Sequence, residues 1–274
     1  DFEATQVGKL TPTYQESVDG AENYGCGMLS SGAIVTSDVG DQAVGPGTGQ
    51  LILWFPPFDR TEVRYCKIDV GIGTAQSIWV SPDDEVYLAS SRGAGTDDRP
   101  GGVYRYSGDW PTGPTAEEGC DGTDATGAPL TTTIERELVI PTGEHGMLFP
   151  SGLAPTPEGG LYVSSVASGV IAEYDLDGTF VRTILEPEPG DALDADSFTT
   201  GTPLGIGVGP DGTLYYADIG VVSTVEDGSP YIGPGELTGS VRRIVIADGE
   251  PSAPETMADG LAFPDGIGIW LSAG

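Results

Sequence analysis

The chain has 274 residues, of which 42 are acidic and 11 basic, so its formal net charge at pH 7 is −31. This charge repels phosphate backbones and anionic membranes, so we expect no nucleic-acid partner and favour cations or basic surfaces. The sequence has no apolar run of about 20 residues for a transmembrane segment. It also has no P-loop for nucleotides, no CxxCH motif for haem, and no Cys and His cluster for zinc.

Three cysteines, Cys26, Cys66 and Cys120, allow one disulfide and leave one thiol, and their spacing does not decide which two pair. Cys120 lies in a segment rich in Gly, Thr and Asp, where a disulfide would hold the chain. The sequence begins at Asp1 without an initiator Met or a signal-peptide pattern. We therefore expect an extracytoplasmic protein, either secreted or periplasmic.

One hairpin pattern recurs along the chain. It consists of a short apolar strand, a turn rich in Pro, Asp, Glu and Gly, and a second strand with an aromatic second residue. This combination predicts a β-hairpin. In chain order the copies occupy 32–40 (the weakest), 77–91, 152–166 and 205–219, and a last copy begins at 266.

Two further strands follow each hairpin. The clearest pair lies in 169–185, where an Asp-Leu-Asp-Gly turn separates two apolar strands, and similar strands occur at 101–109, 133–140 and 239–247. A repeated unit of four antiparallel strands is typical of the blades of a β-propeller. A β-sandwich is the alternative, but it would not repeat the same hairpin.

The spacing of the copies predicts five blades, with an insertion at 110–130 in the longest interval. The last copy ends after a single strand. We therefore expect residues 1–27 to contribute to closing the ring and residues 28–274 to form the propeller itself.

Three segments, 168–184, 201–220 and 261–269, resemble the NHL-repeat and SMP-30/gluconolactonase-like β-propellers. The resemblance covers residues 75–270 well and 1–70 poorly, and it implies six blades, which is the norm of that group. The group includes lactonases, the streptogramin lyase and pure binding modules, so the resemblance does not name an activity.

The topology of a blade places the loops between blades, and those between second and third strands, on one face around the central channel. We call this the channel face. Binding residues concentrate in such loops, so we expect the site there, for a protein, glycan or small molecule. The candidate binding residues are Gln76, Ser151, Trp110 in the insertion, and Tyr231 in the long loop 218–239.

The residue before each inner strand is expected at the mouth of the channel, and only Asp265 is charged among these residues. The Phe-Pro-Asp-Gly sequence around Asp265 matches a position that supplies a metal ligand in the SMP-30-like enzymes. The resemblance therefore implies Ca²⁺ or Mg²⁺ at Asp265. Asp218, at the end of a Tyr-Tyr-Ala-Asp sequence on the channel face, is a second candidate oxygen donor, and a structural role is its alternative. A turn-capping role is the alternative for Asp265. In chain order the aligned residues are Ser31, Gln76, Ser151, Leu204 and Asp265.

His145, the only histidine, lies beside Glu144 in a loop between two predicted blades. A histidine on the channel face is suited to act as a general base near neutral pH. The lyase of the resembling group uses a histidine together with a metal. The alternative is an exposed loop residue without a catalytic task.

Two functions follow from these patterns. We favour an exported, acidic propeller that binds a partner through its channel-face loops, because the set of metal ligands is incomplete. The alternative is a Ca²⁺- or Mg²⁺-dependent lactonase, ester hydrolase or streptogramin-lyase-like enzyme. That alternative requires Asp265, Asp218 and His145 to converge within one channel.

Overall fold

The computed structural model describes residues 23–40, 48–58, 63–90, 100–226 and 228–269. The chain forms two compact units, residues 1–138 and 139–274, which are described separately below. The regular secondary structure of the described residues consists of β-strands and one short 3₁₀ helix, η1 (Ala116–Glu118). None of their helical structure has the length and hydropathy needed to cross a membrane.

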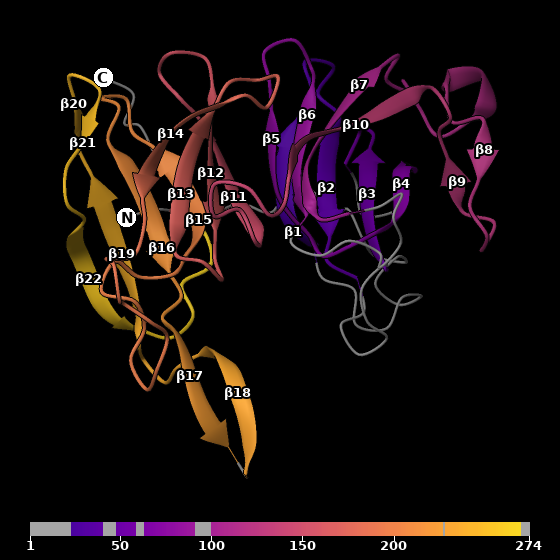
Figure 1. The fold of residues 1–274 in the computed structure, drawn as a ribbon. Helices are drawn as coiled ribbons and strands as arrows, with labels where there is room; N and C mark the ends of the chain where they lie inside the picture. Colours follow the sequence, from indigo (N-terminus) through magenta and orange to yellow (C-terminus); the bar gives the residue numbers. More distant parts are fainter. Residues whose placement is uncertain (1–22, 41–47, 59–62, 91–99, 227, 270–274) are drawn as a thin grey trace, which may run out of the picture. The chain divides into compact units, whose positions relative to one another are not determined.

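The first unit contains two antiparallel sheets of four strands (Figure 1). One has the order β1-β2-β3-β4, and two short strands, β9 and β8, extend it beyond β4. The other has the order β5-β6-β7-β10. The strands are β1 (Asn23–Met28), β2 (Ile34–Asp38), β3 (Gly49–Trp54), β4 (Tyr65–Ile72), β5 (Ala75–Val80), β6 (Val86–Ser90), β7 (Gly102–Gly108), β8 (Gly122–Thr123), β9 (Pro129–Leu130) and β10 (Ile134–Pro141), the last of which ends in the second unit.

The second unit repeats this architecture with the sheets β11-β12-β13-β14 and β15-β16-β19-β22. A hairpin, β17–β18, is inserted after β16 and extends away from the sheets of its unit (Figure 1). The strands are β11 (Pro150–Pro155), β12 (Leu161–Ser165), β13 (Val170–Tyr174), β14 (Phe180–Leu185), β15 (Pro203–Val208), β16 (Leu214–Asp218), β17 (Val221–Glu226), β18 (Ser229–Pro234), β19 (Gly239–Ile244), β20 (Ile246–Ala247), β21 (Glu250–Pro251) and β22 (Glu255–Leu261).

The four sheets confirm the predicted unit of four antiparallel strands. Their central strands are rich in apolar residues and are buried, as in β12 and β13, where every residue is buried, including two serines and one glutamate. Each unit has its own hydrophobic core, built on residues such as Leu53 and Leu88 in the first and Ile171 and Tyr216 in the second.

The register predicted for the first repeat is wrong. The inner strand of the first sheet is β1, and residues 34–38, expected as an inner strand, form the second strand β2. Gly25 of β1 lies against β5 in the same way as Gly152 of β11 lies against β15. The two glycines of β1 weaken its strand signal, so the sequence pattern favours the more apolar residues of β2.

In the first sheet, Tyr24 rather than Ser31 is therefore the residue that corresponds to Ser151 of β11. Ser31 lies in the turn between β1 and β2. The first sheet therefore begins at Asn23, inside the segment 1–27 that was expected to close the ring. Residues 1–22 and 270–274 lie outside the described residues, so ring closure stays a prediction.

The same serine bridge occurs in both units. The hydroxyl of Ser164 in β12 accepts the Gly152 N–H (2.7 Å) and donates to the Leu204 carbonyl of β15 (2.7 Å). Ser37 in β2 likewise accepts the Gly25 N–H (2.8 Å) and donates to a carbonyl of β5. A Cβ on either glycine would collide with the neighbouring inner strand, so the close approach of the two sheets requires glycine.

The predicted insertion lies between β7 and β10 and is fastened to the outer strand of the first sheet. Cys66 in β4 forms a disulfide with Cys120, and Lys67 pairs with Asp124 at 2.5 Å. Strand β9 pairs with β4 in parallel. Two of the three candidate cysteines are thus confirmed as a disulfide, and Cys26 is an exposed thiol.

Candidate functional site

Two of the predicted channel-mouth residues have different environments. Ser151 is 1% exposed, and its hydroxyl donates to the Phe149 carbonyl (2.7 Å), which orders the start of β11. Gln76 in β5 is half-buried, and its Oε1 atom is buried without a hydrogen-bond partner among the described residues. Of these two residues, Gln76 thus has the free hydrogen-bonding capacity that a ligand could use.

Trp110 and Tyr231 are held by contacts within the chain. The Trp110 ring packs against the core of the first unit, and its Nε1 donates to the Asp84 carbonyl (2.8 Å). The Tyr231 hydroxyl in β18 donates to the Pro234 carbonyl (3.3 Å). Trp110 therefore serves the packing of the insertion, which explains its partial burial.

Asp218 at the end of β16 is 1% exposed and fully engaged by protein donors. Its Oδ1 accepts the backbone N–H groups of Thr202 (2.7 Å) and Gly220 (2.9 Å), and its Oδ2 accepts the Ser240 hydroxyl (2.8 Å). The Arg242 guanidinium lies 3.0 Å from the same Oδ2. A cation placed there would have to displace these donors, so Asp218 does not fit the role of a metal ligand.

Asp265 is exposed and lies after β22 in a segment without regular secondary structure, and its backbone lies against Gly205 of β15. Gly205 of β15 lies against this segment in the same way as Gly152 of β11 lies against β15. This contact is expected for the last predicted copy of the hairpin. Among the described residues, no three His, Cys, Asp or Glu side chains form a group that could hold a metal ion. The calcium or magnesium hypothesis therefore rests on Asp265 and stays a prediction.

His145 lies elsewhere, against the start of β14. Its imidazole stacks on the Phe180 ring, with the ring centres 3.8 Å apart and the planes 6° from parallel. The two rings belong to the wall of a cavity of about 230 Å³, which we call the histidine cavity. Neither Asp218 nor Asp265 contributes to that wall, which is formed by Ile140, Pro141, Glu144, His145, Tyr174, Gly178, Thr179 and Phe180.

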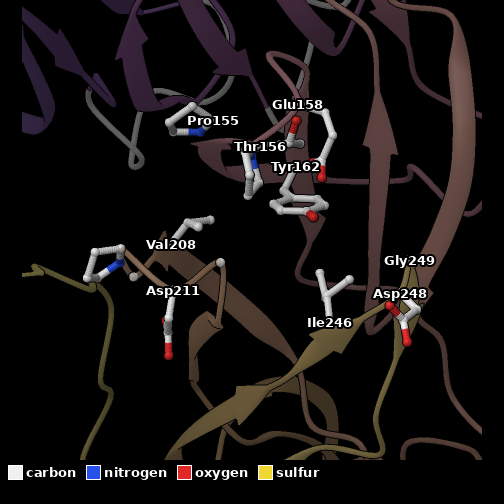
Figure 2. A pocket seen from close by; sticks show the side chains of 13 residues that line it. Pro155, Thr156, Glu158, Tyr162, Val208, Asp211, Ile246, Asp248 and Gly249 are labelled. Atoms are coloured by element: carbon white, nitrogen blue, oxygen red, sulfur yellow. The ribbon is translucent and has the colours of Figure 1, made fainter.

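A larger cleft of about 670 Å³ lies at the repeated hairpin turns of the second unit (Figure 2). It is formed by the turns after β11 and β15 and by the β20–β21 hairpin, and we call it the turn cleft. These turns join the opposite ends of the strands from the channel-face loops. Its lining residues are Pro155, Thr156, Pro157, Glu158, Tyr162, Val208, Gly209, Pro210, Asp211, Gly212, Ile246, Asp248 and Gly249.

The turn cleft combines apolar walls with negative charge. The side chains of Tyr162, Val208 and Ile246 are buried or half-buried, whereas the carboxylates of Glu158, Asp211 and Asp248 are exposed. Burial, followed by the nearby Glu173 carboxylate, raises the pKa of Tyr162 to about 12, so its phenol is neutral. No residue of the lining is basic.

Sequence reasoning missed this cleft because it assigned each Pro-Asp/Glu-Gly turn to chain reversal alone. The signal was present in the repeat itself. Two successive copies carry an acid in the turn, Glu158 and Asp211, and the structure brings both turns to one cleft. The two acids come together because β11 and β15 pack side by side, a tertiary contact that the sequence pattern does not show.

No protein-family model matches the chain, and no curated protein matches its sequence. Solved structures do match. A luciferin-regenerating enzyme is 15% identical with a TM-score of 0.52, and the match covers 92% of this chain and 67% of that one. The PQQ-bound aldose sugar dehydrogenase of Streptomyces coelicolor is 14% identical with a TM-score of 0.51, over 95% of this chain and 73% of that one.

A calcium-binding regucalcin from Agrobacterium tumefaciens is 20% identical with a TM-score of 0.48, and the match covers 73% of this chain. It covers 54% of the regucalcin chain, so this protein matches about half the length of that structure. At these identities the likeness establishes the fold alone. Together with the four-stranded antiparallel sheets, it shows that the chain has the β-propeller fold.

Proposed function

We propose that the protein is a binding module whose partner is a basic, partly apolar segment of another protein, held in the turn cleft. The observation that carries this proposal is the combination in one cleft of apolar walls and three exposed carboxylates, with no basic residue in the lining itself. The cleft lies at the hairpin turns and thus replaces the channel-face loops as the favoured site.

The carboxylates select the charge of the partner. Hydrogen bonds from the Thr213 backbone and side chain hold the pKa of Asp211 below its usual value, so this group is ionised throughout the neutral range. Glu158 and Asp248 stand on two other hairpins around the same cleft. A Lys or Arg side chain can lay its aliphatic stem along the apolar wall while its charged end reaches the exposed acids.

The disulfide supports the proposed location of the protein outside the cytoplasm. A bond between Cys66 and Cys120 persists in an oxidising compartment, which supports a secreted or periplasmic protein that meets its partner there. The metal-dependent lactonase, hydrolase or lyase alternative has less support. Asp218 is engaged by protein donors, and His145 lines a separate cavity.

Fluorescence anisotropy with two labelled peptides tests the proposal. One peptide alternates Lys and Leu, and the other alternates Glu and Leu at the same length. We expect the Lys peptide alone to bind. The combined change Glu158→Gln, Asp211→Asn and Asp248→Asn should weaken its binding by at least about tenfold, because the charges that face the ligand are lost.

A matched control removes the same charge away from the cleft, with Glu135→Gln, Asp177→Asn and Asp259→Asn at exposed positions. This control should bind the Lys peptide as the unmodified protein does. If it loses as much affinity as the cleft variant, the attraction comes from the overall charge and the proposed site is wrong.

A further inference from the structure

The histidine cavity contains a polar group that the fold leaves unsatisfied. Tyr174 of β13 is 2% exposed and lines the cavity, and its hydroxyl has no hydrogen-bond partner among the described residues. A buried hydroxyl without a partner costs about 1–3 kcal/mol, so such groups usually meet water or a ligand. The unpartnered hydroxyl therefore marks the cavity as a place where something binds.

The electrostatic environment of this hydroxyl is negative. Burial, followed by the charge of the nearby Glu144 carboxylate, raises the pKa of Tyr174 to about 12. The phenol is thus neutral and keeps its oxygen lone pairs for a donor, while Glu144 supplies a full negative charge at the exposed side of the cavity. Both groups suit a donor that carries positive charge.

The remaining wall is aromatic and fixed. Phe180 stacks on His145 on one side, and the Tyr174 ring meets it edge-on, with ring centres 5.8 Å apart and planes at 73°. With Ile140 and Pro141 these rings give the cavity an apolar surface beside its two oxygen-bearing groups. The volume of 230 Å³ corresponds to on the order of seven water molecules.

We infer that the histidine cavity binds a small organic cation of the primary-ammonium class, whose N–H groups donate to the Tyr174 hydroxyl and the Glu144 carboxylate. The short alkyl part of the ligand lies against Phe180 and Ile140. An anion would face the Glu144 charge, and a neutral alcohol would gain no attraction from that charge. This site is separate from the turn cleft and does not depend on the function proposed for it.

The test uses n-butylammonium chloride, with 1-butanol and sodium butyrate as the neutral and anionic counterparts. His145 is the only histidine, so its imidazole NMR signals report on the cavity without an assignment ambiguity. We expect butylammonium to shift these signals saturably. Butanol and butyrate should leave them unchanged.

Two variants locate the contact. Tyr174→Phe removes only the hydroxyl and keeps the ring, and Glu144→Gln removes only the charge. Each should weaken butylammonium binding at least about fivefold, as expected for loss of a charge-assisted contact. Tyr162→Phe, a matched change in the turn cleft, should leave it unaltered. A linear response, an equal response to butanol, or full binding by both cavity variants would overturn the inference.

Discussion

Ser164 and Ser37 occupy the same position in the two units, and each joins a glycine N–H of one inner strand to a carbonyl of the next. The corresponding residues of β6 and β16 are Ala89 and Ala217, so the bridge occurs once in each unit. Ser164 is completely buried, and its removal would leave the Gly152 N–H without its partner inside the protein.

We therefore expect Ser164→Ala to lower the free energy of unfolding by about 1–3 kcal/mol, the cost of leaving buried polar groups unpaired. Urea denaturation monitored by tryptophan fluorescence measures this loss. Ser229→Ala, at an exposed position of β18, is the control and should change stability by less than about 0.5 kcal/mol. Equal stability of the two variants would show that water replaces the hydroxyl in the bridge.

Asp218 allows a second prediction at the residue scale, because its carboxylate satisfies two backbone N–H groups, a hydroxyl and Arg242. Asp218→Ala leaves all of them unpaired, and we expect a loss of about 3 kcal/mol. Asp259→Ala, at an exposed position, should cost less than about 0.5 kcal/mol. Thermal and urea unfolding in EDTA and in calcium measure both changes. A loss for Asp218→Ala that appears only with calcium would contradict its structural role.

Among the elements, the insertion between β7 and β10 is held to β4 by three different interactions: the disulfide, the Lys67–Asp124 ion pair and the parallel pairing of β9. The two charged side chains are only 7% and 6% exposed, so solvent screens them weakly. Although burial disfavours its charge, hydrogen bonds from Lys67, Thr126 and Ala128 hold the pKa of Asp124 well below its usual value.

The direction of this shift fixes the pH dependence. A carboxyl group with a lower pKa in the folded state stabilises the fold fully above about pH 5, and this contribution is lost as the pH falls toward its folded-state pKa. The unmodified protein should therefore exceed Asp124→Asn in stability at neutral pH, and the difference should shrink below about pH 4. Urea denaturation at a series of pH values measures it. Lys67→Met should show the same convergence, and a difference that is constant with pH would contradict the assignment.

The β17–β18 hairpin has one apolar face that the described residues leave open. Val225 and Ile232 are 72% and 70% exposed, whereas Val222 on the opposite face is only 4% exposed. We expect the pair Val225→Ser and Ile232→Ser to change stability by less than about 0.5 kcal/mol and to reduce self-association at high concentration. Val222→Ala should cost about 1–3 kcal/mol.

Thermal melting and light scattering measure these two effects. If the serine pair destabilises the protein as much as Val222→Ala does, the exposed face is covered by another part of the chain in solution.

How far the sequence predicts these elements depends on whether the signal is local. The hairpin at 205–219 and the strands of 169–185 are correctly predicted, because apolar alternation and turn chemistry are properties of neighbouring residues. Strand β1 is missed since its glycines are required by the approach of β5, a contact that no local pattern shows. The disulfide partner of Cys66 and the joint cleft of Glu158 and Asp211 are likewise set by tertiary packing.

At the scale of the whole molecule, the shortage of basic residues determines how charge is arranged. Every basic side chain within the described ranges forms an ion pair with a carboxylate. Acidic side chains nevertheless far outnumber basic ones, 42 to 11 in the whole sequence. This arrangement disfavours polyanions, and it leaves carboxylates such as those of the turn cleft available to a basic partner.

The same excess predicts how salt acts on stability. Raising NaCl from about 0.01 M to about 0.1 M shortens the screening length from about 30 Å to about 10 Å, which weakens repulsion among the acids. Salt also weakens exposed pairs such as Arg243–Glu255, but such pairs contribute only about 0–1 kcal/mol each. Because the net charge is −31, the weaker repulsion among the acids should outweigh the weaker ion pairs, and the melting temperature should rise.

Differential scanning calorimetry over this range of NaCl measures the rise. The variant with Glu135→Gln, Asp177→Asn and Asp259→Asn carries three fewer negative charges, so its melting temperature should rise less with salt than that of the unmodified protein. A melting temperature that falls with NaCl would mean that the ion pairs, rather than the surplus of carboxylates, dominate the electrostatic free energy of the fold.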